Sequence, residues 1–294
     1  MLMEVRKEIK LMIFSIKYAL IREMLNKVTF FSNIIFMILN NASFIIQWLV
    51  LYSVKDNVGG YKLNHVLILW GLASLSFGIS HFVFKRSYNL SSTITNGSLD
   101  NYLLQPKNVL LSSITSDVEV SAIGDILYGL VIFFFTGVSI KIFPLYILFG
   151  ITSSLILTSI AVIYGSLAFW FASSEQIADR MNSMVTGFAT YPDGIFKGFI
   201  KILLYTLIPI GVAAYMPVEL MTNFKLYTFL IIIGVTVFLI LFSFFIFNKG
   251  LKRYSSSNLM VARFWERTNN SFSFLVLFYS LFYNLIRWFH EKQI

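Results

Sequence analysis

Residues 226–248 read LYTFLIIIGVTVFLILFSFFIFN, a run of 23 residues without a charged side chain. About 20 predominantly apolar residues are enough for an α-helix to cross the hydrocarbon core of a bilayer. Five further apolar runs occur at residues 29–53, 64–84, 117–140, 144–171 and 199–216. We therefore predict an all-α integral membrane protein with six transmembrane helices, which form a single domain over residues 1–257.

The composition supports insertion into a lipid bilayer. Hydrophobic residues make up 57% of the 294-residue chain and charged residues only 13%, which is about half the charged fraction of a typical soluble domain. The net charge of +9 is explained most simply by loops that face an anionic cytoplasmic leaflet. We expect the lipid bilayer as a partner, and no nucleic acid.

The distribution of Lys and Arg predicts the orientation. Summed over alternate connecting segments, 17 of these residues fall on the side of the N-terminus and four on the other side. The positive-inside rule then places the N-terminus in the cytoplasm of a multi-pass protein of the cell membrane. The same count assigns residues 172–201 to the cytoplasmic side and residues 54–63 to the opposite side.

Two further stretches are amphipathic rather than uniformly apolar. The first 28 residues carry an apolar stripe at helical spacing, formed by Val5, Ile9, Met12, Ile13, Ile16, Leu20 and Met24. This pattern is typical of a helix in the membrane interface, although a cytosolic extension of the first span is an alternative interpretation. Residues 177–188 form a second amphipathic stretch, which we expect on the cytoplasmic side.

Proline and glycine interrupt the fifth run. Pro209 and Gly211 lie inside it and Pro217 follows it, which predicts a broken or re-entrant element; an ordinary proline kink is the alternative. Because irregular backbone at membrane depth must face protein or a water-filled cavity, we select these three residues and Tyr215 as candidates for the lining of a pathway.

Asp125 is the main charged side chain within a predicted span and joins the candidate pathway residues. One interpretation is a contact for a proton or a substrate. The other, which we favour, is a carboxylate that reaches interfacial water or a basic partner, because a single acid makes a poor proton relay.

Residues 97–108, GSLDNYLLQPKN, form a polar segment between apolar runs, and we call this segment the knob. Ser98 is placed to cap a short helix, Asp100 suits its N-terminal end and Pro106 ends it. At helical spacing, Leu99, Tyr102 and Leu103 share one face. An ordered structure at this position predicts a docking surface for a partner, on the cytoplasmic side.

Several kinds of chemistry find no support in the sequence. The phosphate-binding pattern GxxxxGK[ST] is absent, there are no cysteines, and the three histidines lack the spacing of a metal site. We therefore expect no catalytic residues, no metal and no cofactor in this chain, and thus no enzyme activity of its own.

Three stretches together resemble the permeases of ABC type 2 exporters, in particular six-span subunits of multidrug or antibiotic exporters. They are the knob, the pair YPDGIF at 191–196 with IPIGVAAYMPVELM at 208–221, and KGLKRYSS at 249–256. The resemblance implies a second permease copy or paralogue and separate ABC ATPase subunits, which bind ATP and Mg. It also implies coupling through the knob, where we select Leu99, Asp100, Tyr102 and Leu103.

A secondary transporter driven by an ion gradient is the alternative function. It would need buried titrating groups or related halves, whereas the sequence offers only Asp125 and no evident internal repeat. The resemblance ends near Ser257, and residues 258–294 form a C-terminal extension. Its uncharged part, 268–286, has three interpretations: a seventh span, an interfacial helix or an accidental extension.

Overall fold

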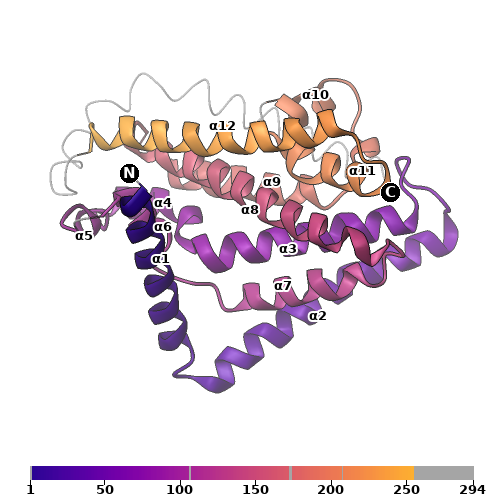
Figure 1. Cartoon of the computed structure of the whole chain (residues 1–294), viewed down its shortest axis with the longest axis horizontal. Coiled ribbons are helices and arrows are strands. Elements are labelled where there is room, and N and C mark those ends of the chain that lie inside the picture. Colours follow the sequence, from indigo (N-terminus) through magenta and orange to yellow (C-terminus); the bar gives the residue numbers. More distant parts are fainter. Residues whose placement is uncertain (1, 106, 172–173, 207, 255–294) are drawn as a thin grey trace.

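The computed structural model describes residues 2–105, 107–171, 174–206 and 208–254. The C-terminal extension, and with it the interpretations of residues 268–286, lies outside the described residues. The described chain consists of helices and loops, with one isolated β-bridge between Val58 and Tyr61. Figure 1 shows long helices stacked in one bundle, with the N-terminal helix α1 (Leu2–Glu23) lying across one end of it.

Four helices of the described residues are long and apolar enough by themselves to cross a membrane. They are α2 (Lys27–Val54), α3 (Leu63–Tyr88), α8 (Phe143–Ser166) and α12 (Leu226–Leu251). They coincide with the predicted spans 29–53, 64–84, 144–171 and 226–248. The short helices η1 (Ile140–Ile142) and η2 (Leu167–Phe169) extend α8 at its two ends.

Helices α3 and α8 form the centre of the bundle. In the most apolar stretch of each of these two helices, 72% of the residues are buried within the chain. The corresponding share is 17% in α2 and 22% in α12. The two central helices run parallel, since Leu75 of α3 lies against Gly150 and Ser80 bonds to Thr158 at 2.7 Å. Helix α12 runs parallel to α8, because Phe229 lies near Phe149 and Phe247 near Phe169.

The predicted span 117–140 contains a much shorter helix, α7 (Ser121–Phe133). Thirteen residues rise about 20 Å, less than the roughly 30 Å of a hydrocarbon core. The helix ends early because the Thr136 hydroxyl donates back to the Phe133 carbonyl at 2.7 Å, and because Gly137 adopts a φ of 72°, in the left-handed region. The length predicted from hydropathy alone, residues 117–140, is therefore too long for this helix.

The predicted span 199–216 is divided as well. It contains α10 (Phe199–Thr206) and the π-helix η4 (Gly211–Tyr215), which continues into α11 (Met216–Thr222). The axes of the two parts differ in direction by 76°. The break falls at Pro209, whose missing N–H and ring are incompatible with a continuous α-helix.

The two ends of the bundle differ in character. One end, the knob end, carries α4 (Leu90–Thr95), α5 (Asp100–Leu103) and α6 (Val109–Ile114). At the opposite end, the hairpin end, the loop at 55–62 meets η3 (Asp193–Ile195). A Cβ added to Gly194 would lie 1.7 Å from the Gly59 carbonyl oxygen, so only glycine allows this close approach.

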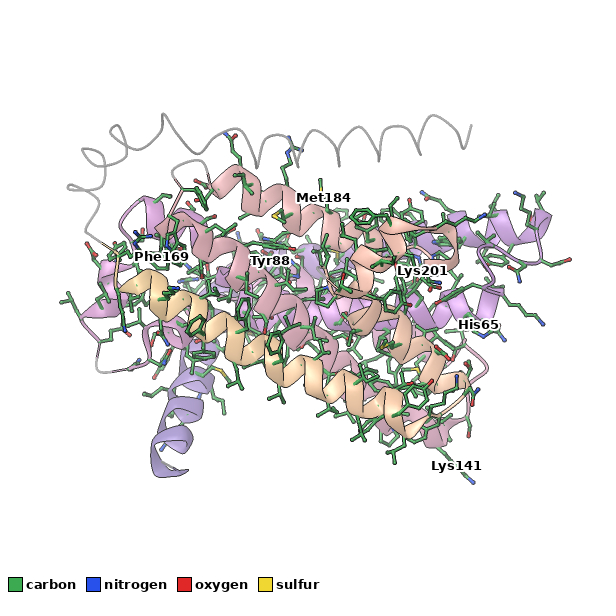
Figure 2. All side chains as sticks on the ribbon, turned by 90° about the horizontal axis from the view of Figure 1, so that it is seen from above. His65, Tyr88, Lys141, Phe169, Met184 and Lys201 are labelled. Carbon is green, nitrogen blue, oxygen red and sulfur yellow. The ribbon has the colours of Figure 1, made fainter. Side chains whose placement is uncertain are left out.

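Helix α9 (Ser174–Ala189) corrects the predicted placement of residues 172–201. It packs along α8 and leads directly to η3, and Tyr191 lies near Trp48 with ring centroids 6.1 Å apart. Figure 2 shows Phe169 toward the knob end, Met184 of α9 further along the bundle, and Lys201, His65 and Lys141 toward the hairpin end. Residues 54–63 and 191–201 therefore lie at the same end, and the predicted placement of residues 54–63 and the whole segment 172–201 on opposite sides is wrong. The amphipathic pattern predicted a helix in this segment, but it did not predict that the helix runs from the knob end to the hairpin end.

Close contacts between α3 and α7 generate a stability prediction. A Cβ on Gly129 would lie 2.7 Å from the backbone of α3, at the Gly71 oxygen and the Leu75 nitrogen, whereas a Cβ on Gly234 of α12 meets nothing within 4 Å. Gly129→Ala should lower the free energy of unfolding by about 1–3 kcal/mol. Gly234→Ala should be neutral or stabilise by up to about 1 kcal/mol. Thermal unfolding of the purified variants in detergent measures both, and equal midpoints for the two variants would contradict the packing described here.

Candidate functional site

The knob is anchored by Leu99, which is fully buried. Its side chain belongs to an apolar cluster, the anchor cluster, that joins the knob to the ends of two long helices. The buried members are Leu90, Ile94, Leu99, Leu110, Ile114, Val162, Ala168, Phe169 and Phe247. Val162 belongs to α8 and Phe247 to α12, so the core residue of the knob lies in the same buried cluster as residues of both helices.

Tyr102 and Asp100 strengthen this attachment with polar contacts. The Tyr102 hydroxyl lies 2.8 Å from the Ser116 hydroxyl, which fixes α5 to the segment that follows α6. Tyr254, just beyond α12, lies close to Asp100: burial and, secondarily, the Asp100 carboxylate raise the pKa of the Tyr254 hydroxyl.

The exposed face of the knob differs from the face predicted by helical spacing. Helix α5 has only four residues, and the Ser98 hydroxyl donates to Asn96 at 2.7 Å instead of capping the helix. Leu99 is directed into the core, while Leu103 is 42% and Leu104 88% exposed. The apolar surface that the knob offers to a partner therefore consists of Leu103 and Leu104, with Leu99 as the internal anchor.

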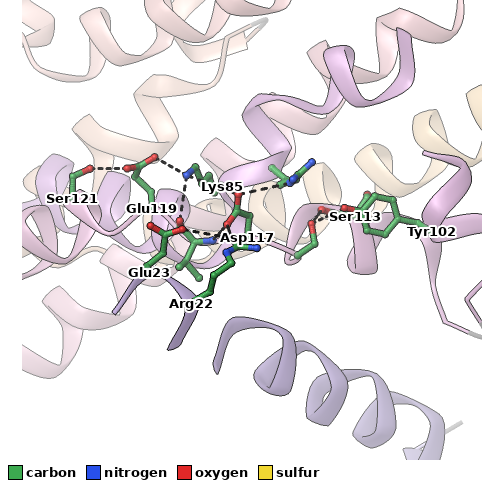
Figure 3. A network of polar contacts seen from close by, with 11 residues as sticks. Arg22, Glu23, Lys85, Tyr102, Ser113, Asp117, Glu119 and Ser121 are labelled. Atoms are coloured by element: carbon green, nitrogen blue, oxygen red, sulfur yellow. Dashed lines mark hydrogen bonds and ion pairs between the residues drawn. The ribbon is translucent and has the colours of Figure 1, made fainter. Parts of the chain in front are cut away.

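An ion-pair network next to the knob was not predicted from the sequence. Figure 3 shows Asp117 between Arg22 of α1 and Lys85 of α3. Lys85 Nζ lies 3.2 Å from a carboxylate oxygen of Glu119, and 3.9 Å from one of Asp117. Arg86 approaches Asp117 at 4.0 Å. The network ties the end of α1 to α3 and to the segment before α7. The only signal in the sequence was charge at the ends of apolar runs, which does not specify pairs.

A polar groove of about 440 Å³ lies beside this network. Its lining includes Arg86, Ser98 of the knob, and Glu175 and Asp179 from the beginning of α9. The groove therefore places the acidic first half of α9 at the knob end, close to the basic end of α3.

A second cavity, the lateral cleft, lies between α2, α3, α7 and the end of α9, and has a volume of about 500 Å³. Asp125 of α7 lines it, and its carboxylate accepts a hydrogen bond of 2.6 Å from the Asn41 amide of α2. Among the described residues, no Lys, Arg or His forms an ion pair with Asp125. The basic partner considered for Asp125 in the sequence is thus replaced by an amide.

The other four candidate pathway residues, Pro209, Gly211, Tyr215 and Pro217, do not line the lateral cleft. All four are buried in the packing around η4 and α11. The Tyr215 hydroxyl donates to the Phe188 carbonyl of α9 at 2.6 Å, and the ring of Tyr205 covers Gly211. The structure therefore separates Asp125 from this group and gives the π-helix a packing environment of protein.

Comparison with known proteins gives one match. The sequence profile described as ABC-2 family transporter protein matches residues 37–258, from within α2 to beyond the end of α12. No curated protein and no solved structure matches the chain. The match spans most of the chain and every long helix of the bundle, in agreement with the multi-pass architecture and the resemblance found in the sequence. The chain belongs to the ABC-2 family of membrane transport proteins.

Proposed function

We propose that this chain is the permease subunit of an ATP-driven exporter and that its knob receives force from separate ABC ATPase subunits, which bind ATP and Mg. Family membership supports the transport role. The observation that carries the coupling proposal is that the knob has an exposed and a buried part: Leu103 and Leu104 are exposed, whereas Leu99 is buried in the cluster that includes Val162 of α8 and Phe247 of α12.

The anchor cluster provides the route for the force. Interiors packed at crystal-like density transmit displacement instead of absorbing it, so motion of the exposed leucines moves Leu99 and, with it, Phe247 of α12 and Val162 of α8. An ATPase that binds two arrangements of these helices with different affinity would shift the population between them. Asp100 and Tyr102 keep the knob in register with the bundle.

We further propose a six-crossing topology in which α9 replaces residues 199–216 as the fifth crossing. In this topology α2, α3, α7, α8, α9 and α12 cross, and α10 with α11 enters and leaves at the hairpin end. Within the described residues, the knob end carries 13 Lys and Arg and the hairpin end six, which supports a cytoplasmic knob and N-terminus. The short α7 can cross the bilayer if the bilayer is locally thinned, or if the residues that flank the helix extend to the membrane interfaces.

A second permease, identical or paralogous, would complete the pathway. Exposed polar side chains of α9, such as Ser183 and Thr186, are costly to place against lipid. A partner subunit or a water-filled pathway between two subunits would solvate them. Ion-gradient coupling has less support, because the described partner of Asp125 is an amide and not a second titrating group.

The docking proposal predicts that Leu103→Asp combined with Leu104→Asp abolishes co-purification of the ATPase subunit with this chain, because two carboxylates cannot be buried in an apolar interface without a partner. Val54→Asp is the matched control, since Val54 is 81% exposed at the hairpin end. The ATPase retained on affinity-purified chain measures the effect. Full retention by the double variant, with normal membrane insertion, would refute docking at the knob.

The topology predicts the labelling of single cysteines, which the cysteine-free chain allows. In spheroplasts, an impermeant maleimide should label Asp56→Cys and Lys197→Cys, whereas Lys252→Cys should react only after permeabilisation. All three positions are exposed, so differences in labelling report sidedness. If Asp56→Cys is labelled and Lys197→Cys is not, the six-crossing topology proposed here is wrong, and the topology derived from the charge distribution alone is favoured.

A further inference from the structure

Asp125 in the lateral cleft has no Lys or Arg partner within the part of the chain that the structure describes. Glu119, at the same cleft, is compensated by Lys85 at 3.2 Å. Asp125 receives only the Asn41 amide among the described residues. A carboxylate at membrane depth is expensive to maintain unless a counter-charge or water reaches it, so the free side of Asp125 is suited to a cationic ligand.

Two pairs of aromatic rings line the cleft around this acid. Phe44 of α2 stacks on Trp70 of α3 with ring centroids 5.1 Å apart, and Trp48 meets Tyr191 at 6.1 Å. Aromatic faces attract cations and also cover apolar groups. A volume of about 500 Å³ lies within the range of sites for drug-sized molecules.

The cleft also contains two buried polar atoms without a hydrogen-bond partner among the described residues, Trp70 Nε1 and Ser74 Oγ. Trp70 is 8% and Ser74 4% exposed, and the two are one helical turn apart on α3. Other buried serines of the bundle, such as Ser76 and Ser166, satisfy their hydroxyls on their own helix. Because an unpaired buried polar atom costs about 1–3 kcal/mol, the α3 wall of the cleft gives up stability at these two residues.

We propose that the lateral cleft selects an organic cation with an apolar, aromatic or aliphatic body: Asp125, oriented by Asn41, neutralises the cationic centre, and Phe44, Trp48, Trp70 and Tyr191 cover the body. The inference rests on the proposed permease function and specifies its substrate class. Neutral molecules of the same shape gain the aromatic contacts but lose the ion pair, so charge is the selected property.

Equilibrium binding to the wild-type chain in nanodiscs, with any subunits that co-purify, tests the proposal. The probes are tetraphenylphosphonium, a hydrophobic cation, and triphenylphosphine oxide, a neutral molecule of related shape. Asp125→Asn should raise the Kd for the cation about tenfold or more, equivalent to about 1.4 kcal/mol, and leave the Kd for the neutral probe within about twofold. Asp125→Glu should retain the preference for the cation.

Asp56→Asn is the matched control, because it removes one negative charge from an exposed loop at the hairpin end and should change neither Kd. Absence of tetraphenylphosphonium binding to wild type, equal affinity in Asp125→Asn, or equal loss of both probes would each overturn the proposal. Binding as predicted in a chain that retains no ATPase would contradict the proposed exporter function alone. Retention of the ATPase without selective cation binding would contradict this inference alone.

Discussion

Contact between the backbones of α3 and α7 is the constraint on which the rest of the bundle depends. Gly129 lies against α3 at the level of Gly71 and Leu75, and Gly78 lies against Ala122 and Ile126 of α7. Lipid gives helices little hydrophobic reason to associate, so small residues that permit close packing provide the attraction. With α7 held this close, α2 reaches α3 and α7 together, and the lateral cleft is formed between them.

The same central position makes α3 the element that links the knob to the bundle. At its end it carries Lys85 and Arg86, which hold Asp117, and it continues through α4 to the knob. Leu99 then returns the chain to the anchor cluster, where α8 and α12 end. The exposed Leu103 and Leu104 are consequently attached to a packed junction and not to a loose loop.

Polar groups inside the bundle are arranged in two ways. Hydroxyls such as those of Ser80 and Thr158 pair with each other between central helices, and this pairing removes the cost of burying them. Trp70 Nε1 and Ser74 Oγ, on residues that line the lateral cleft, are instead buried without a hydrogen-bond partner among the described residues, and Asp125 has only the Asn41 amide. The second arrangement gives up stability locally, which is typical of sites that receive a ligand.

The amino-acid sequence by itself determined the helical class, four of the long helices, the position of the knob and the family, because uncharged runs of this length have few solutions other than membrane helices. It failed for α7, whose end depends on the backbone of Gly137, and for α9, whose polar face gave no direction. Only the tertiary structure decided that Leu99 points inward and that Asn41 meets Asp125, 84 residues away. The physical reason is that periodicity identifies one face of a helix, whereas the neighbour of that face, whether lipid, water or another helix, is fixed by contacts between segments distant in the chain.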